Sequence, residues 1–195
     1  MATIVEDFAP TAIKNASVQF KESDGTVQPG TKFGCVGSME GETTLKELIK
    51  RCEGVEVGKK IKPEKIDLTI SGHIPIAVVR NFFGINTDNL KPGIYKYSTQ
   101  SKAKEFIFTA DVIDEFEDVV KLIAFPKAVS AIGFKFAVEN GADEVAEMEV
   151  EITAYPDENG NLYYEALVAE LTDTTVADTW HTQFNYALVE AVPTP

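Results

Sequence analysis

The sequence predicts a mainly β protein, with antiparallel strands in a sandwich or barrel-like arrangement and one α-helix flanking them. Three observations indicate this class. Several segments alternate apolar and polar residues, turn residues separate these segments, and one segment carries helix signals at both of its ends. Many strands with a single helix are typical of an antiparallel sheet covered by that helix, and 195 residues suffice to bury a core.

The strand predictions depend on alternation with a period of two. The sharpest case is EMEVEITAY, residues 147–155, in which apolar side chains alternate with Glu147, Glu149 and Glu151. One face of this strand is therefore expected to be apolar and the other acidic. Looser alternation predicts further strands in residues 13–20, 61–71, 105–113, 119–126, 132–139 and 162–171.

The helix prediction falls on HIPIAVVRNFFGI, residues 73–85. Pro75 suits a first helical turn, and Gly84 suits the position that ends a helix. We expect Ile76, Val79 and Phe83 to anchor this helix on the sheet.

Residues 42–53, ETTLKELIKRCE, allow two interpretations. Their apolar residues recur at the i, i+3, i+4 and i+7 spacing of an amphipathic helix, which Gly54 would close. The several threonines and the absence of proline leave a strand possible.

The stretch Asp157-Glu158-Asn159-Gly160-Asn161 is rich in oxygen ligands, as a calcium loop is, and also resembles a tight turn. An EF-hand loop needs glycine at its sixth position and glutamate at its twelfth, where this chain has Leu162 and Val168. Asn-Gly between two alternating segments is a strong signal for a β-hairpin. The sequence therefore predicts a hairpin here and no metal site.

The ends of the chain differ from its middle. We expect an N-terminal arm over residues 1–12, a β-rich domain over residues 13–171 and a C-terminal arm or extension over residues 172–195. The C-terminal extension carries Trp180, Phe184 and Tyr186, which we expect to contact other subunits.

Composition excludes several classes of function. The 18 basic and 31 acidic residues give a net charge of −13, which argues against specific nucleic-acid binding. No apolar run is long enough to span a membrane, and the first residues do not read as a secretory signal. Cys35 and Cys52 are too few for a disulfide framework, so we expect two packed free thiols in a reducing compartment.

No catalytic motif is visible, so we predict no enzymatic activity and no cofactor. His73 and His181 lie in no recognisable nucleophile setting, and there is no phosphate-binding loop. Acidic clusters include Asp111 and Asp114 as well as the three glutamates of residues 147–151. Paired carboxylates serve glycoside hydrolysis, but we favour a face in contact with water or a water-filled channel.

Three stretches between Lys62 and Tyr164 carry a family resemblance. They are ISGHIPIAVVRNFFGI, LKPGIYKYSTQSKAKEFIFTADVIDEFEDVVKLIAFPKA and EVAEMEVEITAYPDENGNLYYEALV, in that order. This region resembles the major tail proteins, or tail tube proteins, of long-tailed bacteriophages and their prophage relatives. The likeness is looser over the first 60 residues.

The resemblance implies a tail-tube-like β subunit with a flanking helix. In that family the subunits associate with copies of themselves into hexameric rings. The rings stack through terminal arms and a long loop. DNA passes through the lumen of the stack without specific binding. It implies contacts with tape measure, terminator and initiator proteins, assembly in the bacterial host cytoplasm and a final place in the virion tail. It also suggests an extended strand-loop-strand for residues 42–60. Glu147, Glu149, Glu151, Asp111 and Asp114 are then candidates for the lumen.

Two alternatives stay open. One is another tail-like part, such as a tail terminator or the inner tube of a contractile or bacteriocin-like particle. The other is a carbohydrate- or small-ligand-binding β-sandwich, whose cleft would need clustered surface tyrosines.

Overall fold

The protein is one antiparallel β-sheet that bends over its own core. The computed structural model describes residues 4–116, 119–135 and 147–191. The strands are β1 (Pro10–Phe20), β2 (Thr31–Lys32), β3 (Cys35–Cys52), β4 (Val55–His73), β5 (Phe106–Asp114), β6 (Val120–Ser130), β7 (Met148–Ala154) and β8 (Tyr164–Leu167). Their order in the sheet is β2-β1-β5-β6-β7-β4-β3, with β8 paired to β6. The mainly β class is confirmed.

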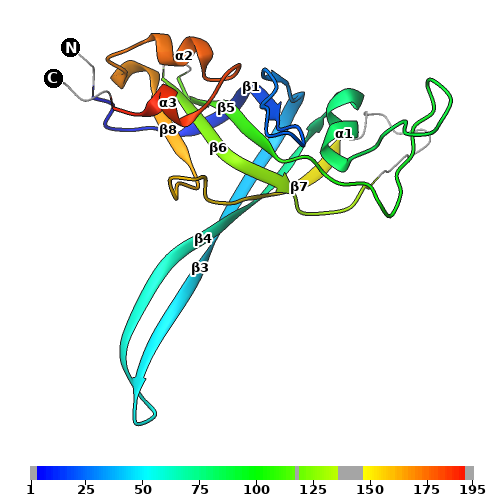
Figure 1. Ribbon diagram of the computed structural model, residues 1–195. Coiled ribbons are helices and arrows are strands. Elements are labelled where there is room, and N and C mark those ends of the chain that lie inside the picture. Colours follow the sequence, from blue (N-terminus) through cyan, green and yellow to red (C-terminus); the bar gives the residue numbers. More distant parts are fainter. Residues whose placement is uncertain (1–3, 117–118, 136–146, 192–195) are drawn as a thin grey trace.

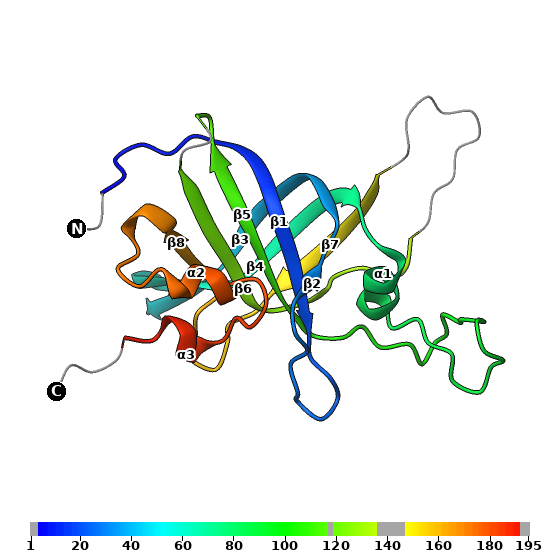
Figure 2. The same cartoon turned by 90° about the horizontal axis from the view of Figure 1, so that it is seen from above.

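The main core lies between the two halves of the bent sheet (Figures 1 and 2). One half contributes Val18 of β1 and Phe108 of β5, and the other contributes Ile70 of β4 and Ile152 of β7. These four side chains are no more than 1% exposed. The apolar side of each alternating strand therefore faces inward, as the period of two predicts.

The helix α1 (Ile76–Phe83) forms where the sequence predicts it. Gly84 ends the helix with a φ of 68°, and its N–H reaches the carbonyl oxygens of Arg80 and Asn81. Val79 and Phe83 pack into the core as expected, whereas Ile76 is 65% exposed. The prediction that Ile76 anchors the helix is therefore wrong, because it points away from the sheet in the first turn.

Strand β6 carries two partners on one of its edges. Residues 121–124 pair with β8, and residues 128–130 pair with β7. Between these two ladders the register with β5 shifts, and Pro126, which has no N–H to donate, occupies this bulge.

The Asn159-Gly160 turn is present, but the hairpin predicted around it is not. Gly160 has a φ of 84°, and the Asp157 N–H donates to the Asn161 carbonyl at 3.0 Å. Strands β7 and β8 both pair with β6 instead of with each other. The Asp157 side chain accepts from the backbone N–H groups of Asn159 and Asn161, which stabilises the turn.

The longest element is the β3–β4 hairpin, which projects from the body of the molecule (Figure 1). The two strands pair from Cys35 and His73 at the base to Cys52 and Val55 at the tip. Glu53 and Gly54, with φ values of 50° and 85°, form the two-residue turn. The interpretation of residues 42–53 as a helix is therefore wrong. Their backbone N–H and C=O groups form hydrogen bonds with β4 instead of within a helix.

The C-terminal segment packs on the sheet of its own chain. It forms the 3₁₀ turn η1 (Val168–Glu170) and the short helices α2 (Thr175–Thr179) and α3 (Tyr186–Val189). Trp180 and Phe184 are 1% and 2% exposed, and they form a second core with Leu122 and Ala124 of β6. They leave no surface for another subunit, so the prediction of Trp180 and Phe184 as subunit contacts is corrected. Tyr186 is 39% exposed, and its role as a contact stays a prediction.

The N-terminal segment is shorter than the predicted arm, because β1 already begins at Pro10. Residues 4–9 have no regular secondary structure. They lie beside the C-terminal segment, where the Val5 N–H donates to a side-chain oxygen of Glu170 at 3.1 Å.

Candidate functional site

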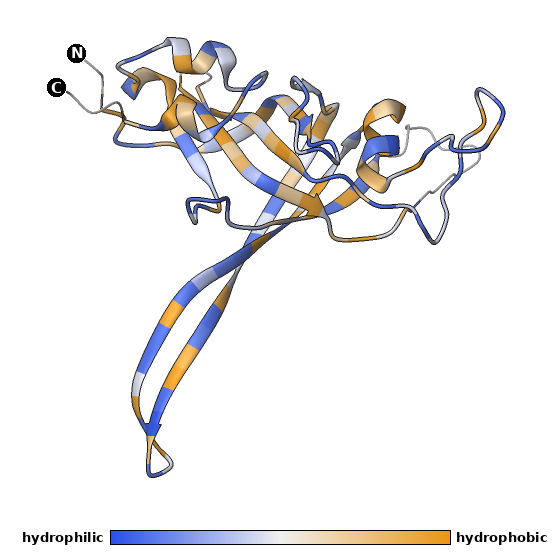
Figure 3. Cartoon of the chain, in the orientation of Figure 1, coloured by the Kyte–Doolittle hydropathy of each residue, from blue (hydrophilic) through white to orange (hydrophobic). Residues whose placement is uncertain are grey.

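The outer part of the β3–β4 hairpin is exposed on both faces. Every residue from 45 to 64 is exposed, including Leu45, Leu48, Ile49 and Ile61. Figure 3 shows apolar positions alternating with polar ones along both strands of this arm. Large apolar side chains that nothing covers indicate a surface that contacts another molecule.

One face of the arm is mainly apolar. Leu45 stands opposite Pro63, and four residue pairs closer to the tip Ile49 stands opposite Lys59. Side chains of directly opposite residues share a face, so this face carries Leu45, Ile49 and Ile61 around a Glu47–Lys59 ion pair of 2.6 Å. We call it the apolar hairpin face.

The other face of the arm is basic. Alternation along the two strands brings Lys46, Lys50, Lys60 and Lys62 together around Leu48. Lys46 stands directly opposite Lys62 and is 3.5 Å from Glu64. Within the described ranges, Lys50, Lys60 and Lys62 have no ion pair. We call this surface the basic hairpin face.

The charge of the hairpin arm is opposite to that of the rest of the chain. Residues 43–65 contain seven Lys and Arg and four Glu, a net charge of +3. The remaining residues contain 11 basic and 27 acidic groups, a net charge of −16, which together with the arm gives the total of −13. The acidic composition therefore does not describe the arm.

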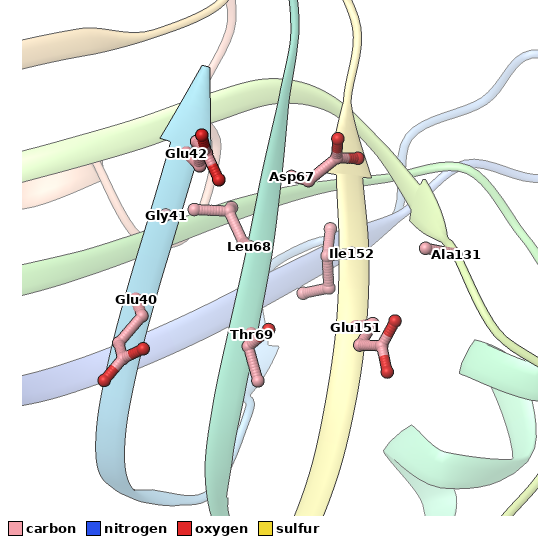
Figure 4. A pocket seen from close by; sticks show the side chains of 9 residues that line it. All are labelled: Glu40, Gly41, Glu42, Asp67, Leu68, Thr69, Ala131, Glu151 and Ile152. Atoms are coloured by element: carbon pink, nitrogen blue, oxygen red, sulfur yellow. The ribbon is translucent and has the colours of Figure 1, made fainter. Parts of the chain in front are cut away.

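The base of the same hairpin carries an acidic surface. Glu40 and Glu42 of β3, Asp67 of β4, and Glu149 and Glu151 of β7 lie on the sheet face that points away from the main core. Figure 4 shows Glu40, Glu42 and Glu151 around a shallow depression of about 560 Å³. We call this surface the acidic sheet face.

Some of these carboxylates have a counterion in the same chain. Lys65 lies 2.7 Å from Asp67, and the Thr153 hydroxyl donates to the same carboxylate at 2.7 Å. The hydrogen bond from Lys65, and then that from Thr153, hold the pKa of Asp67 below its ordinary value. Lys135 lies 3.3 Å from Glu151 and 3.9 Å from Glu149.

Glu40 and Glu42 have no such partner. Among the residues that the structure describes, neither one makes an ion pair or a side-chain hydrogen bond. Both are exposed, so the acidic sheet face keeps unbalanced negative charge at its β3 edge.

The predicted acidic residues separate into two groups. Glu149 and Glu151 lie on the acidic sheet face, and Glu147 lies beside it, where it accepts from the Ser71 hydroxyl at 2.9 Å. Asp111 and Asp114 are only 7% and 5% exposed, so their assignment to a solvent or lumen face is corrected.

Glu40, Glu42 and Asp67 were not among the acidic residues that the sequence pattern predicted for this surface. Apolar and polar residues alternate in SMEGET and in KIDLTIS. This alternation places the three acids on the sheet face that points away from the core. The strand around Glu40 was not predicted because Gly34, Gly37 and Gly41 lie close together in this stretch, and glycine is typical of loops.

Asp111 belongs to a polar network that the sequence did not indicate. Its two oxygens contact His181 Nε2 at 2.8 Å and Asn15 Nδ2 at 2.6 Å. His181 Nδ1 lies 2.9 Å from the Thr109 hydroxyl. A hydroxyl, an imidazole and a carboxylate in this order resemble a catalytic triad, but Thr109 is fully buried and no substrate can reach it. The network attaches the C-terminal segment to β1 and β5.

Three of the tyrosines have local partners on different elements. Tyr95 stacks under Arg80, with the guanidinium carbon 3.4 Å from the ring centre. Tyr163 packs against Phe125, and Tyr164 donates to Asp157 at 2.6 Å. These three rings thus have separate local partners, whereas Tyr164 and Tyr186 both line one pocket with Trp180.

The described part of the chain shows no metal-ligating cluster and no helix long and apolar enough to cross a membrane. Cys35 and Cys52 are free, as predicted, but they are exposed instead of packed, because both lie on the projecting strand β3.

The fold and its surfaces define a β-rich protein with an exposed arm and two oppositely charged patches. No family model matches the chain, and no curated protein matches it. Among solved structures it is similar to one described as the cryo-EM structure of the anti-feeding prophage cap (AFP tube terminating cap). The two chains are 10% identical with a TM-score of 0.46, over 84% of this chain and 94% of the other. A likeness at this level carries no argument about the chain described here.

Proposed function

We propose that the protein is a non-enzymatic structural subunit that assembles with copies of itself in a phage tail or tail-like particle. The observation that carries this proposal is the β3–β4 hairpin, whose outer part, residues 45–64, is exposed throughout and carries large apolar side chains. The sequence resemblance to major tail proteins supports the choice of particle.

An isolated two-stranded ribbon is only marginally stable in water. A partner that covers a long ribbon therefore stabilises it. The outer hairpin is such a ribbon, and each of its faces lacks a covering layer. A partner that covers the apolar hairpin face removes Leu45, Ile49 and Ile61 from water, and burying an apolar side chain of this size contributes about 1.5–3 kcal/mol.

The finer form of the proposal is a tail tube subunit in stacked hexameric rings, through which DNA passes. Tape measure, terminator and initiator proteins are then its further partners, and assembly takes place in the host cytoplasm. The alternative form is a tail terminator or the inner tube of a contractile particle. Within either form the acidic sheet face has two possible uses: the wall of a channel that repels phosphate, or a docking surface for a basic partner.

Replacing residues 45–64 by Asn-Gly tests the proposal. This change joins Thr44 to Lys65, which stand opposite each other, by a two-residue turn. We expect a folded monomer with a nearly unchanged melting temperature, because the removed residues are exposed. Sedimentation velocity and negative-stain electron microscopy over a concentration series should show polymers or rings of the wild type and none of the variant.

A full-length control separates the role of the apolar side chains from that of the arm itself. The triple variant Leu45→Thr, Ile49→Thr and Ile61→Thr keeps the length, the strand propensity and the charge of the hairpin. It should also lose assembly. A wild-type protein that stays monomeric at every concentration would contradict self-assembly, whereas closed single rings in place of tubes would favour the terminator.

A further inference from the structure

We infer that the basic hairpin face of one copy docks on the acidic sheet face of a second copy, an inference that rests on the proposed self-assembly. It goes beyond that proposal because it assigns the two surfaces that meet and predicts that their contact is electrostatic.

Each surface carries charges that have no ion pair among the described residues. They are Lys50, Lys60 and Lys62 on the basic hairpin face, and Glu40 and Glu42 on the acidic sheet face. Lys62 stands directly opposite Lys46, and Glu42 stands directly opposite Asp67. Lys46 and Asp67 each have a counterion, Glu64 and Lys65, whereas Lys62 and Glu42 have none among the described residues. Like charges at directly opposed positions of a sheet destabilise it. A partner of the opposite sign removes this cost on both surfaces at once.

The two surfaces cannot meet within one molecule. Glu40, Glu42, Lys46 and Lys50 alternate along the same strand, so they lie on the same side of one ribbon, with the acids near its base and the lysines near its tip. To bring them together within one chain, the hairpin would have to fold back on itself and break its own ladder. The partner is therefore another molecule.

The spacing of the two arrays is the same. Both are faces of antiparallel strands, on which side chains recur about every 6.6–6.8 Å along a strand and strands lie about 4.7–4.9 Å apart. Lys60 and Lys62 are two residues apart on one strand face, as are Glu40 and Glu42. The two pairs therefore have the same spacing.

A second copy fits the basic hairpin face better than nucleic acid does. Outside residues 43–65 the chain carries a net charge of −16, which repels phosphate over the rest of the surface. The same charge attracts the arm of a neighbour. Because the hairpin face of one copy meets a different face of the next, the contact is heterologous and generates a ring or an open filament.

The experiment uses two charge-reversed proteins. One carries Lys60→Glu and Lys62→Glu in the hairpin, and the other carries Glu40→Lys and Glu42→Lys on the sheet. Each variant alone confronts like charges at the contact, so the protein concentration that it needs for assembly should rise at least about tenfold. An equimolar mixture should assemble as the wild type does, because every contact between unlike variants again joins opposite charges.

A matched control tests for an effect of net charge alone. Lys91→Glu with Lys102→Glu makes the same change in charge at exposed positions outside the hairpin, and it should assemble as the wild type does. Wild-type assembly itself should weaken between about 0.05 M and about 1 M salt, since screening shortens the range of exposed charges. All variants should retain the wild-type melting temperature.

Several outcomes would overturn the inference and leave self-assembly intact. One is normal assembly of the hairpin variant, another is equal loss in the Lys91/Lys102 control, and a third is no recovery on mixing. Wild-type assembly combined with duplex DNA binding that the hairpin variant alone loses would assign the lysines to nucleic acid. A wild type that remains monomeric would overturn the proposed function itself.

Discussion

At the scale of single residues, Asp111 joins three parts of the chain. It contacts Asn15 at the start of the chain and His181 near its end, from the middle of β5. This aspartate was predicted to lie on a solvent or lumen face because acidic residues cluster around it in the sequence. A carboxylate is either exposed to solvent or buried with polar partners. The local sequence pattern does not distinguish these two situations.

Tyr164 makes the alkaline stability of the protein depend on one hydroxyl. Burial, followed by the hydrogen bond to Asp157, raises the pKa of Tyr164 to about 12. In the unfolded chain a tyrosine ionises near a pKa of about 10. Between these values the folded state keeps a proton that the unfolded state has lost, so this contribution to stability falls as the pH rises from about 10 to about 12.

We therefore expect Tyr164→Phe to be less stable than the wild type at neutral pH, by about 1–3 kcal/mol, because Asp157 and Asn161 lose their partner. The difference from the wild type should shrink between pH 10 and 12. Urea denaturation at a series of pH values measures both effects. Tyr95→Phe, at an exposed ring, should parallel the wild type, and parallel curves for both variants would contradict the prediction.

At the scale of elements, the end of α1 depends on glycine for two reasons. Gly84 has a φ of 68°, and a Cβ at this position would overlap the carbonyl group of Lys102. Gly25 has a φ of 90° but open space around it. Gly25→Ala should cost about 1 kcal/mol from backbone strain alone. Gly84→Ala should cost clearly more, and equal losses in thermal denaturation would show that the Lys102 segment moves aside.

Alternation correctly predicted strands that have one buried face. The strand predicted over residues 132–139 is absent from residues 132–135, and residues 136–139 lie outside the described residues. Strands β4, β5 and β7 and helix α1 follow the expected pattern because a core covers one side of each. The outer half of β3 lacks a core on either side, so Leu45, Leu48, Ile49 and Cys52 obey no burial period and mimic a helical stripe. Its strand conformation comes from pairing with β4, which depends on residues far along the chain.

Long-range pairing also explains the turn at Asn159-Gly160. The local signal correctly predicted a turn, but the choice of partner strand depends on β6 and on its bulge at Pro126. For a similar reason, only some residues of the acidic sheet face were predicted from the sequence. Glu149 and Glu151 share one strand, whereas the other acids reach them only through the sheet order β7-β4-β3.

At the scale of the whole molecule, the C-terminal segment belongs to the folded body. Deleting residues 172–195 removes Trp180 and Phe184 from the second core and exposes Leu122. Loss of one buried aromatic side chain alone typically costs about 3–5 kcal/mol. We therefore expect the truncated protein to melt at a much lower temperature in calorimetry, in contrast to the variant that lacks the outer hairpin. A truncated protein with an unchanged melting temperature would show that this segment does not stabilise the body.

The strands of the hairpin have a mechanical consequence. β4 runs without interruption from the tip at Val55 to the core, where it pairs with β7 from Ile66 to Gly72. A pull on the tip therefore acts along β4 and loads this ladder in shear, so that its hydrogen bonds, which lie across the strands, must yield together instead of opening one by one. An arm built in this way transmits tension directly into the body of the subunit, and a neighbour that grips it pulls on the central strands of the fold.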